Sequence, residues 1–351
     1  MSDKSGIAWT EASWNPVTGC TKVSAGCKHC YAEREWTRLA ANPQSGVYHG
    51  RQFTDVACHP ERLDQPLRWT KPRRIFVNAM ADLFHESVPD AFIDQVFAVM
   101  ALAPQHTFQV LTKRAERMRG WFAPGYDNRE HAVGHAMREI AASRGGDDAG
   151  LPEWPLANVW LGVSAEDQET AETRIPVLLE TPAAVRWVSL EPLLGPVDLS
   201  SWLNPDATCE QCDTNCPDCP HHKAVVIDNP KDPGFPKTQT LSWVVCGGES
   251  GPRARVFRAE WAREILQQCR AADVPFFMKQ MGAAFNDGRF TVKLRHRAGA
   301  DMGEWPEDLR VREYPLQMND PMRRMARLTD GERQEILSNA KIRTSMRPLK
   351  P

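Results

Sequence analysis

Short apolar runs recur along the chain, and polar or charged residues follow each of them. The runs begin near residues 73, 107, 158, 185, 241 and 274. A continuous apolar run of about four to six residues is typical of a parallel strand buried on both faces. The pattern therefore predicts six parallel strands, and a further strand is expected before them near Ile7–Trp9.

Helical spacing fills several of the segments between these runs. In residues 89–103 and 260–274, apolar side chains recur every three to four positions, as on one face of a helix. Cys269 is one of the spaced residues and is predicted to be a small core residue. Strands that alternate with helices form right-handed crossovers and a parallel sheet. Six or seven strands favour an α/β fold of the TIM-like or partial β/α barrel type, with a doubly wound sheet as the alternative.

Polar side chains stand just past the apolar part of each predicted strand. The carboxyl ends of parallel strands share one rim of a barrel, where such enzymes place their active sites. Each of these residues alone also fits a solvated loop, but their recurrence on six strands predicts a common site. They are Asp82, Lys113, Arg114, Ser164, Glu166, Asp167, Glu191, Glu249 and Lys279.

Two stretches interrupt this alternation. Residues 120–156 hold a predicted helix and a loop rich in Gly and Asp, and residues 200–239 hold a cysteine cluster and a proline-rich connection. We interpret both as insertions into one barrel domain, residues 1–282. Residues 283–351 are then a C-terminal cap with a basic helical tail. The tail is interpreted as a solvated helix, with a nucleic-acid contact as the alternative.

Composition limits the cellular location and the binding partners that we expect for the protein. The chain of 351 residues has a formal net charge of −2, which gives no bulk field that would attract nucleic acid or a membrane. No apolar run reaches the ~18–20 residues of a membrane span, and the N-terminus lacks the apolar core of a signal peptide. A cytoplasmic location without a membrane partner is expected, where clustered cysteines more often bind metal than form disulfides.

Seven of the ten cysteines fall in two short clusters. The first contains Cys20, Cys27 and Cys30, with the spacing C-x6-C-x2-C. A closed tetrahedral zinc site needs four ligands, so three thiolates better suit a [4Fe–4S] cluster with one iron left open. S-adenosylmethionine can occupy that iron through its amino and carboxylate groups. Zinc and unligated thiols are the alternatives.

The second cluster contains Cys209, Cys212, Cys216 and Cys219, with the spacing C-x2-C-x3-C-x2-C. Two cysteine pairs can close a tetrahedral Zn–S4 shell. Zinc is the predicted metal, and a second iron–sulfur cluster is the alternative because the pairs lie close together. The insertion that holds them would stabilise the fold or contact a partner macromolecule.

Long motifs along most of the chain resemble known families. The stretch "GCKHCYAE" resembles the cluster loop of radical S-adenosylmethionine enzymes, particularly the spore photoproduct lyase-like branch. The chain also resembles a phage and prophage family of unknown function, sometimes called three-Cys-motif phage proteins. This resemblance rests on the same stretch together with "WNPVTGC", "DLFHESVP", "LTKRAERM", "NVWLGVSAEDQ", "VSLEPLLGPVDL", "GGESGPRAR" and "PFFMKQMG". The common radical-enzyme motif has three residues between its first two cysteines, whereas this chain has six. His29 replaces the usual aromatic residue.

The resemblance implies roles for the rim residues. Lys113, Arg114 and Lys279 would meet a phosphate or carboxylate of the substrate. Asp82 would act as an acid or base, and His85 is either a second such group or a structural histidine. Cys246 is interpreted as a buried strand residue, with hydrogen donation as the alternative. The implied catalytic residues are Asp82, Lys113, Glu191 and Lys279. The implied cofactor contacts are Ser164, Glu166, Ser189, Gly247, Gly248 and Glu249, although a tight turn explains the two glycines equally well.

The implied function is reductive cleavage of S-adenosylmethionine to modify or repair a nucleotide, a nucleic acid or a protein encoded by a neighbouring gene. The alternative is a non-catalytic metal-binding phage protein that binds nucleic acid or a partner protein. The absence of bulk basic charge counts against a pure nucleic-acid binder. A zinc hydrolase is a weaker interpretation, because the sequence holds no His/Glu ligand set with suitable spacing.

Overall fold

The computed structural model describes residues 5–123, 126–146, 150–203, 225–226 and 238–315. The chain divides into a compact unit, Met1–Glu313, and a second unit, Tyr314–Pro351. The four cysteines of the second cluster and the basic tail from residue 316 lie outside the described residues. The metal expected at residues 209–219 and the helix expected in the tail therefore stay predictions.

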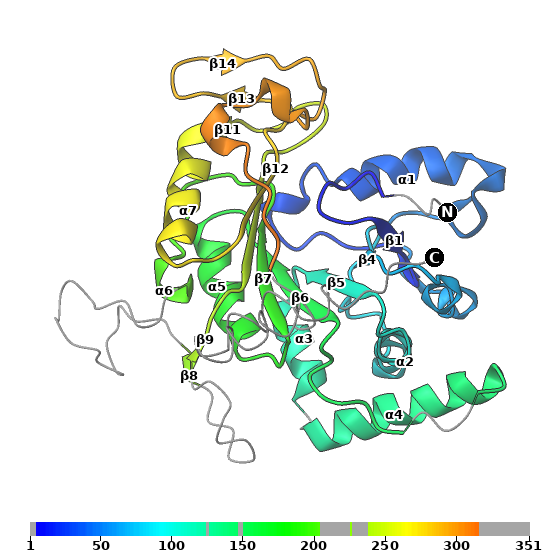
Figure 1. The fold of residues 1–351 in the computed structure, drawn as a ribbon. Helices are drawn as coiled ribbons and strands as arrows, with labels where there is room; N and C mark the ends of the chain where they lie inside the picture. The colour runs from blue at the N-terminus through cyan, green and yellow to red at the C-terminus, as the bar shows by residue number, and fades with distance from the viewer. Residues whose placement is uncertain (1–4, 124–125, 147–149, 204–224, 227–237, 316–351) are drawn as a thin grey trace, which may run out of the picture. The chain divides into compact units, whose positions relative to one another are not determined.

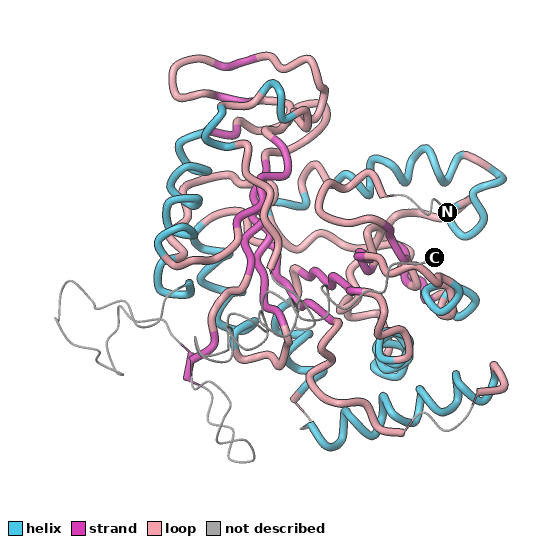
Figure 2. Tube along the Cα trace, viewed as in Figure 1, coloured by secondary structure: helices cyan, strands magenta, loops and turns pink. Residues whose placement is uncertain are grey.

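A seven-stranded parallel sheet forms the centre of the first unit (Figures 1 and 2). Every neighbouring pair of strands in it is parallel. Because the strands follow chain order, the sheet is a half-barrel, and the predicted α/β fold with a partial barrel is confirmed at that level. In order across the sheet, the strands are β1 (Ala12–Trp14), β4 (Arg74–Val77), β5 (Thr107–Thr112), β6 (Val159–Ser164), β7 (Val185–Leu190), β10 (Trp243–Gly247) and β12 (Phe276–Gln280).

The first strand differs from the prediction. Residues 7–10 form a turn in which the Thr10 N–H donates to the Ile7 carbonyl at 3.2 Å, and the strand begins only at Ala12. Trp9 is buried, and its ring lies edge-on to Trp187 with centroids 5.3 Å apart. The apolar signal near residue 9 thus comes from a side chain that fills the barrel interior and not from a strand.

Helices flank the sheet (Figure 1). They are α1 (Tyr31–Ala41), α2 (Asp90–Ala101), α3 (Ala115–Phe122), α4 (Tyr126–Ser143), α5 (Gln168–Leu179), α6 (Ser200–Leu203) and α7 (Ala259–Ala271). Apolar spacing correctly predicts α2 and α7, and Cys269 is fully buried as expected. Asp167 caps α5 by accepting from the Thr170 N–H, which explains that rim residue as a structural cap. None of the helices in the described part of the chain has the length and apolar character of a membrane span.

Smaller elements complete the chain. β2 (Val17–Thr18) pairs with β3 (Ala57–Cys58), and β8 (Val225–Val226) pairs with β9 (Thr238–Gln239). β11 (Phe257–Arg258), β13 (Phe285–Asn286) and β14 (Thr291–Val292) form a three-stranded sheet, the cap sheet, which joins a segment of the predicted barrel to the start of the predicted C-terminal cap. The short 3-10 helices are η1 (Ala25–Cys27), η2 (Pro43–Tyr48), η3 (Pro60–Arg62), η4 (Pro66–Arg68), η5 (Met302–Glu304) and η6 (Glu307–Leu309).

Aromatic side chains form a layer inside the half-barrel. The rings of Trp187 and Trp243 lie 5.2 Å apart, and a Cβ on Gly162 would overlap the Trp187 indole. Side chains alternate along a strand, so residues two positions further point into the barrel one layer higher. Ser164 and Ser189 stand in those positions. The alternation of side chains along the strands therefore places Ser164 and Ser189 directly above the aromatic layer.

Candidate functional site

A cavity of about 390 Å³ lies above this aromatic layer, at the carboxyl ends of the strands. Trp9 and Phe76 contribute its apolar lining. All four residues predicted to be catalytic line it: Asp82, Lys113, Glu191 and Lys279. Of the predicted cofactor contacts, Ser164, Ser189, Gly248 and Glu249 line it, whereas Glu166 and Gly247 contact lining residues without lining the cavity themselves.

The three cysteines of the first cluster line the same cavity, on a segment that we call the cysteine loop (residues 19–30). Cys20 follows Gly19, whose φ of 91° and contact with the Asp55 backbone exclude a side chain. Cys27 ends η1, and Cys30 immediately precedes α1. Within the described residues, no three His, Cys, Asp or Glu side chains are arranged to hold a metal ion. The fold thus gathers the thiols at one cavity without forming a ligand shell.

Burial favours the protonated form of two of these thiols. It raises the pKa of Cys20 to about 11, with a smaller contribution from the charge of Asp82. Burial also raises the pKa of Cys30, although the backbone N–H groups of Glu33 and Ala32 oppose this effect. A thiolate becomes stable in such a place when a metal supplies positive charge. Three soft donors that face a cavity therefore fit an iron–sulfur centre chemically.

Arg114 holds the first end of the cysteine loop. Its Nη1 lies 3.6 Å from Cys20 Sγ and 3.3 Å from Asp82 Oδ2, and its Nη2 donates to Thr21 Oγ1 at 3.0 Å. Asp82 also accepts hydrogen bonds from Thr112 Oγ1 at 2.7 Å and from a backbone N–H at 3.1 Å. The carboxylate predicted to be an acid or base is therefore already bound by several donors of the chain.

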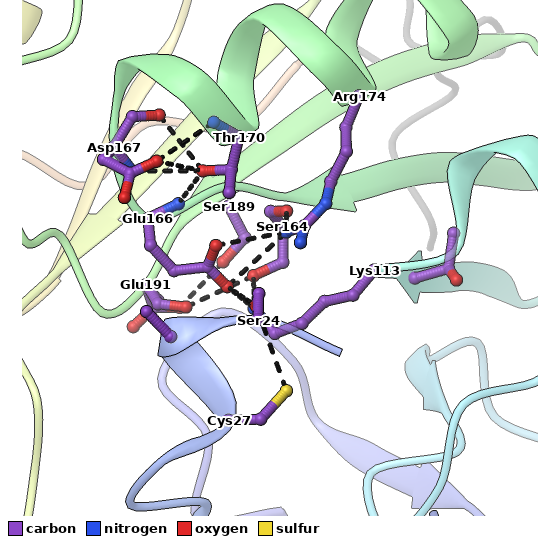
Figure 3. A network of polar contacts seen from close by, with 12 residues as sticks. Ser24, Cys27, Lys113, Ser164, Glu166, Asp167, Thr170, Arg174, Ser189 and Glu191 are labelled. Atoms are coloured by element: carbon purple, nitrogen blue, oxygen red, sulfur yellow. Dashed lines mark hydrogen bonds and ion pairs between the residues drawn. The ribbon is translucent and has the colours of Figure 1, made fainter. Parts of the chain in front are cut away.

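Glu166 holds the middle of the cysteine loop (Figure 3). Its fully buried carboxylate accepts hydrogen bonds from Ser24 Oγ at 2.8 Å and from Lys113 Nζ. Arg174 on α5 donates to the second carboxylate oxygen at 3.2 Å. Burial alone would raise the pKa of Glu166, but the charges of Lys113 and Arg174 outweigh burial and hold that pKa below its ordinary value. Glu166 is therefore an ionised anchor for the loop.

Gly26 allows the loop to approach this carboxylate. A Cβ on Gly26 would overlap Oε1 of Glu166, so a larger residue would push the turn away. On the same turn, Ser24 Oγ lies 4.0 Å from Cys27 Sγ (Figure 3). The position of the Cys27 thiol thus depends directly on the contact between the loop and Glu166.

Lys113 and Arg114 are consecutive residues just past β5, and they serve different parts of the cysteine loop. Arg114 pairs with Asp82 beside Cys20, whereas Lys113 pairs with Glu166 beneath the following turn. The sequence suggested both cations for a substrate phosphate. In the structure each is matched by a carboxylate of the chain, and together they brace the loop.

A further ion pair lines the cavity. Lys279 Nζ lies 2.9 Å from Glu191 Oε1, and Ser189 Oγ donates to Glu191 Oε2 at 3.1 Å. A Cβ on Gly247 would lie 2.6 Å from the Glu191 carboxylate, so glycine makes room for it. Gly248 likewise has no room for a Cβ, which would overlap a backbone carbonyl. Close packing therefore explains the first two glycines of the "GGESG" motif.

Glu249 connects the cysteine loop to the segment after β10. Its Oε2 lies 3.1 Å from His29 Nδ1 and accepts the Arg255 backbone N–H at 2.8 Å. Arg255 Nη2 donates to Oε1 at 2.6 Å, while Nη1 donates to the Ala25 carbonyl at 2.9 Å. Burial would raise the pKa of Glu249, but the hydrogen bonds from Arg255 and His29 prevail and lower it to about 2. His29 thus binds a carboxylate where radical enzymes have an aromatic residue.

The family described as "Protein of unknown function (DUF5131)" matches residues 4–335, which include every residue of this cavity. The chain belongs to the DUF5131 family. No curated protein matches the chain, and no solved structure matches it. The family description names no activity, so the function of this DUF5131 protein has to be argued from its site.

Two other candidates from the sequence do not line the DUF5131 cavity. His85 is buried with Nε2 2.9 Å from Thr21 Oγ1, and burial, followed by the charge of Arg114, lowers its pKa. Cys246 is completely buried in β10, and burial raises its pKa well above the ordinary value. Both fit structural roles, which for His85 is the role already weighed from the sequence.

Sequence reasoning missed several residues of the DUF5131 site. Ser24 meets Glu166 across 142 positions of sequence, and no local pattern signals such a contact. Asn78 lines the cavity with a φ of 62°, and its Oδ1 accepts the backbone N–H of Val17 at 3.1 Å. Tyr31 and Arg34 line the cavity from α1. Their places directly after the last cysteine of the motif are the only signal that could have indicated them.

Proposed function

We propose that this DUF5131 protein is an iron–sulfur enzyme of the radical S-adenosylmethionine type. The observation that carries the proposal is the meeting of Cys20, Cys27 and Cys30 with the polar strand ends in one cavity. Three thiols, with no fourth cysteine among the residues described around this cavity, are the set that leaves one iron of a [4Fe–4S] cluster open. The rim of a β/α barrel is also the usual place for catalysis in this kind of fold.

The cavity suits a small ligand next to the thiols. Its volume of about 390 Å³ falls in the range of roughly 300–1,000 Å³ that is common for small-molecule sites. The aromatic lining from Trp9 and Phe76 excludes water from its base. When bound, a reduced cluster supplies the electron that cleaves S-adenosylmethionine to a radical able to abstract hydrogen from the substrate.

In this proposal the protein's own residues bind the cluster and orient the cofactor. Cys20, Cys27 and Cys30 would hold the cluster, on a loop that is braced from both sides. The pair of Glu191 and Lys279 presents both signs of charge to the cavity. Such a pair can open to receive a zwitterion, because the ligand's ammonium group can meet Glu191 while its carboxylate meets Lys279.

Anaerobic reconstitution with iron and sulfide tests the ligand set. The wild-type chain should bind about four more iron atoms than Cys30→Ala, which lacks one cluster ligand. Cys58→Ala is the matched control, because Cys58 is a half-buried free cysteine that does not line the cavity. This control should keep the wild-type iron content. The ligand assignment would be refuted if each of the variants Cys20→Ala, Cys27→Ala and Cys30→Ala retained all of the iron that the wild type binds.

Release of 5′-deoxyadenosine from S-adenosylmethionine, with dithionite as the reductant, tests the reaction. The reconstituted wild type should release it, and Cys30→Ala should not. Cys58→Ala should release it at the wild-type rate. A wild-type protein with full iron content and no release would instead favour the non-catalytic metal-binding function.

A further inference from the structure

The cap sheet stands at the edge of the cavity. β12 carries the lining residues Lys279 and Gln280, and the chain then enters the cap sheet. The Ala283 N–H donates to the carbonyl of Glu249, another lining residue, at 2.8 Å. In Figures 1 and 2 the hairpin of β13 and β14 extends beyond the carboxyl ends of the central strands. A ligand that reaches the cavity from this side therefore passes the cap sheet.

Large apolar side chains are exposed around this edge. In the described part of the chain, Phe290 is the most exposed of them at 73%, and Val256, directly before β11, is 45% exposed. Val23 on the cysteine loop and Tyr31 in the cavity lining are exposed as well. Arg255 joins two of these segments by donating to Ala25 on the cysteine loop. Exposed apolar groups gathered around a cavity are typical of an interaction surface.

Exposed cationic side chains accompany the exposed phenyl ring. Side chains alternate in direction along β14 and the residues that follow it. Val292 and Leu294 pack against the core, so Lys293 between them is exposed. Arg289 and Arg297 are also exposed, and within the described residues none of these three cations forms an ion pair. The neighbouring Asp287 accepts the backbone N–H groups of Arg289 and Phe290 at 2.8 Å and balances part of the charge of Arg289, whereas no carboxylate is paired with Lys293 or Arg297 among the described residues. Arg295, by contrast, pairs with Glu304 at 3.1 Å.

We propose that Arg289, Phe290, Lys293 and Arg297, which we call the cap surface, bind single-stranded nucleic acid and present one nucleotide to the cavity. This inference rests on the proposed function and names its substrate class. Lys and Arg neutralise phosphates, and an exposed aromatic ring stacks an unpaired base of any sequence. An enzyme that acts on a base needs that base outside the stack, which a single strand presents directly, whereas a duplex has to release the base first.

Fluorescence anisotropy with fluorescein-labelled DNA and RNA oligonucleotides of about 20 nucleotides tests the cap surface on the full chain as purified. Arg289→Ala/Lys293→Ala should weaken binding about tenfold and lower the salt slope by about 1.4, at ~0.7 per phosphate contact. Phe290→Ala should weaken binding about tenfold with the salt slope unchanged. Arg138→Ala is the control, because Arg138 is exposed on α4, at the other end of the molecule in Figure 1, and should change nothing.

Several outcomes would overturn the inference. The first is that the wild type does not bind the oligonucleotide at low salt. The second is that Arg138→Ala weakens binding as much as the cap variants do. The third is that only Arg323→Ala/Arg324→Ala of the tail weakens binding. Equal binding to phosphatidylglycerol vesicles, competitive with the oligonucleotide, would point to an anionic membrane surface instead. Because this assay needs no cluster, its failure is distinct from failed 5′-deoxyadenosine release.

Discussion

At the scale of single residues, Glu166 is the side chain on which the cysteine loop depends most. It joins Ser24 of the loop to Lys113 beyond β5 and to Arg174 of α5. Its charge balances two cations, of which Arg174 is buried. When one member of such a network is removed, the buried charge of its partners is compensated neither by water nor by the protein.

Glu166→Gln should therefore destabilise the fold by about 3–5 kcal/mol. Urea unfolding at neutral pH measures the change in the free energy of unfolding. Glu264→Gln on the exposed side of α7 removes the same charge without a buried partner and should stay within about 0.5 kcal/mol of the wild type. Equal stability of the two variants would mean that Glu166 is not an anchor.

Glu249 makes stability depend on pH in the acid range. Its pKa is about 2 in the folded protein and ordinarily 4.5, so folding favours its ionised form. The stabilisation is complete above pH 4.5 and is lost as the pH falls toward 2. Across this window the free energy of unfolding of the wild type should fall further than that of Glu249→Gln. Parallel curves for the two proteins in urea titrations would assign the acid sensitivity to other groups.

At the scale of elements, the central strands were predictable and the loop contacts were not. Strands buried on both faces leave apolar runs in the sequence, and their ends point to a shared rim because parallel strands run the same way. The first strand was misplaced because Trp9 is apolar for a different reason, its place in the barrel interior. The contact of Gly26 with Glu166 joins distant segments, so only the fold reveals why that position lacks a side chain.

Gly26→Ala should displace the turn that carries Cys27, because the new Cβ overlaps the Glu166 carboxylate. We expect a loss of about 1–3 kcal/mol, as for other overpacked sites, together with reduced iron uptake on reconstitution. Gly120→Ala in α3 is the control, since no atom lies within 4 Å of its added Cβ. That variant should be as stable as the wild type or more so, and should bind iron normally. Normal iron uptake by Gly26→Ala would show that the turn can shift freely.

At the scale of the whole molecule, an aromatic layer separates the site from the rest of the half-barrel. Trp187 contacts Trp9 and Trp243, whose rings come from distant parts of the chain. These side chains fill the interior below the polar strand ends. The apolar base of the cavity therefore combines a strand residue, Phe76, with Trp9, which packs against this layer from the turn before β1.

Trp187→Ala should cost about 3–5 kcal/mol, because it leaves a void in the barrel interior. Thermal and urea unfolding both measure this loss, and the variant should also bind an apolar dye in the enlarged cavity. Phe290→Ala is the comparison, because a ring that is 73% exposed contributes little to folding. Similar losses in the two variants would contradict the role of Trp187 as a structural floor.

The bracing of the cysteine loop has a consequence for the proposed metal site when it is empty. Irregular segments near a surface usually open to solvent far more often than the core beneath them. Here Thr21 and Ser24 are fastened to side chains that follow β5 and β6, in the middle of the sheet. Amide exchange in this segment should accordingly be faster in Glu166→Gln, where the anchor has lost its charge, than in the wild type. Under the proposed function, a chain that loses its cluster to air would keep its thiols in position and take up iron again without refolding.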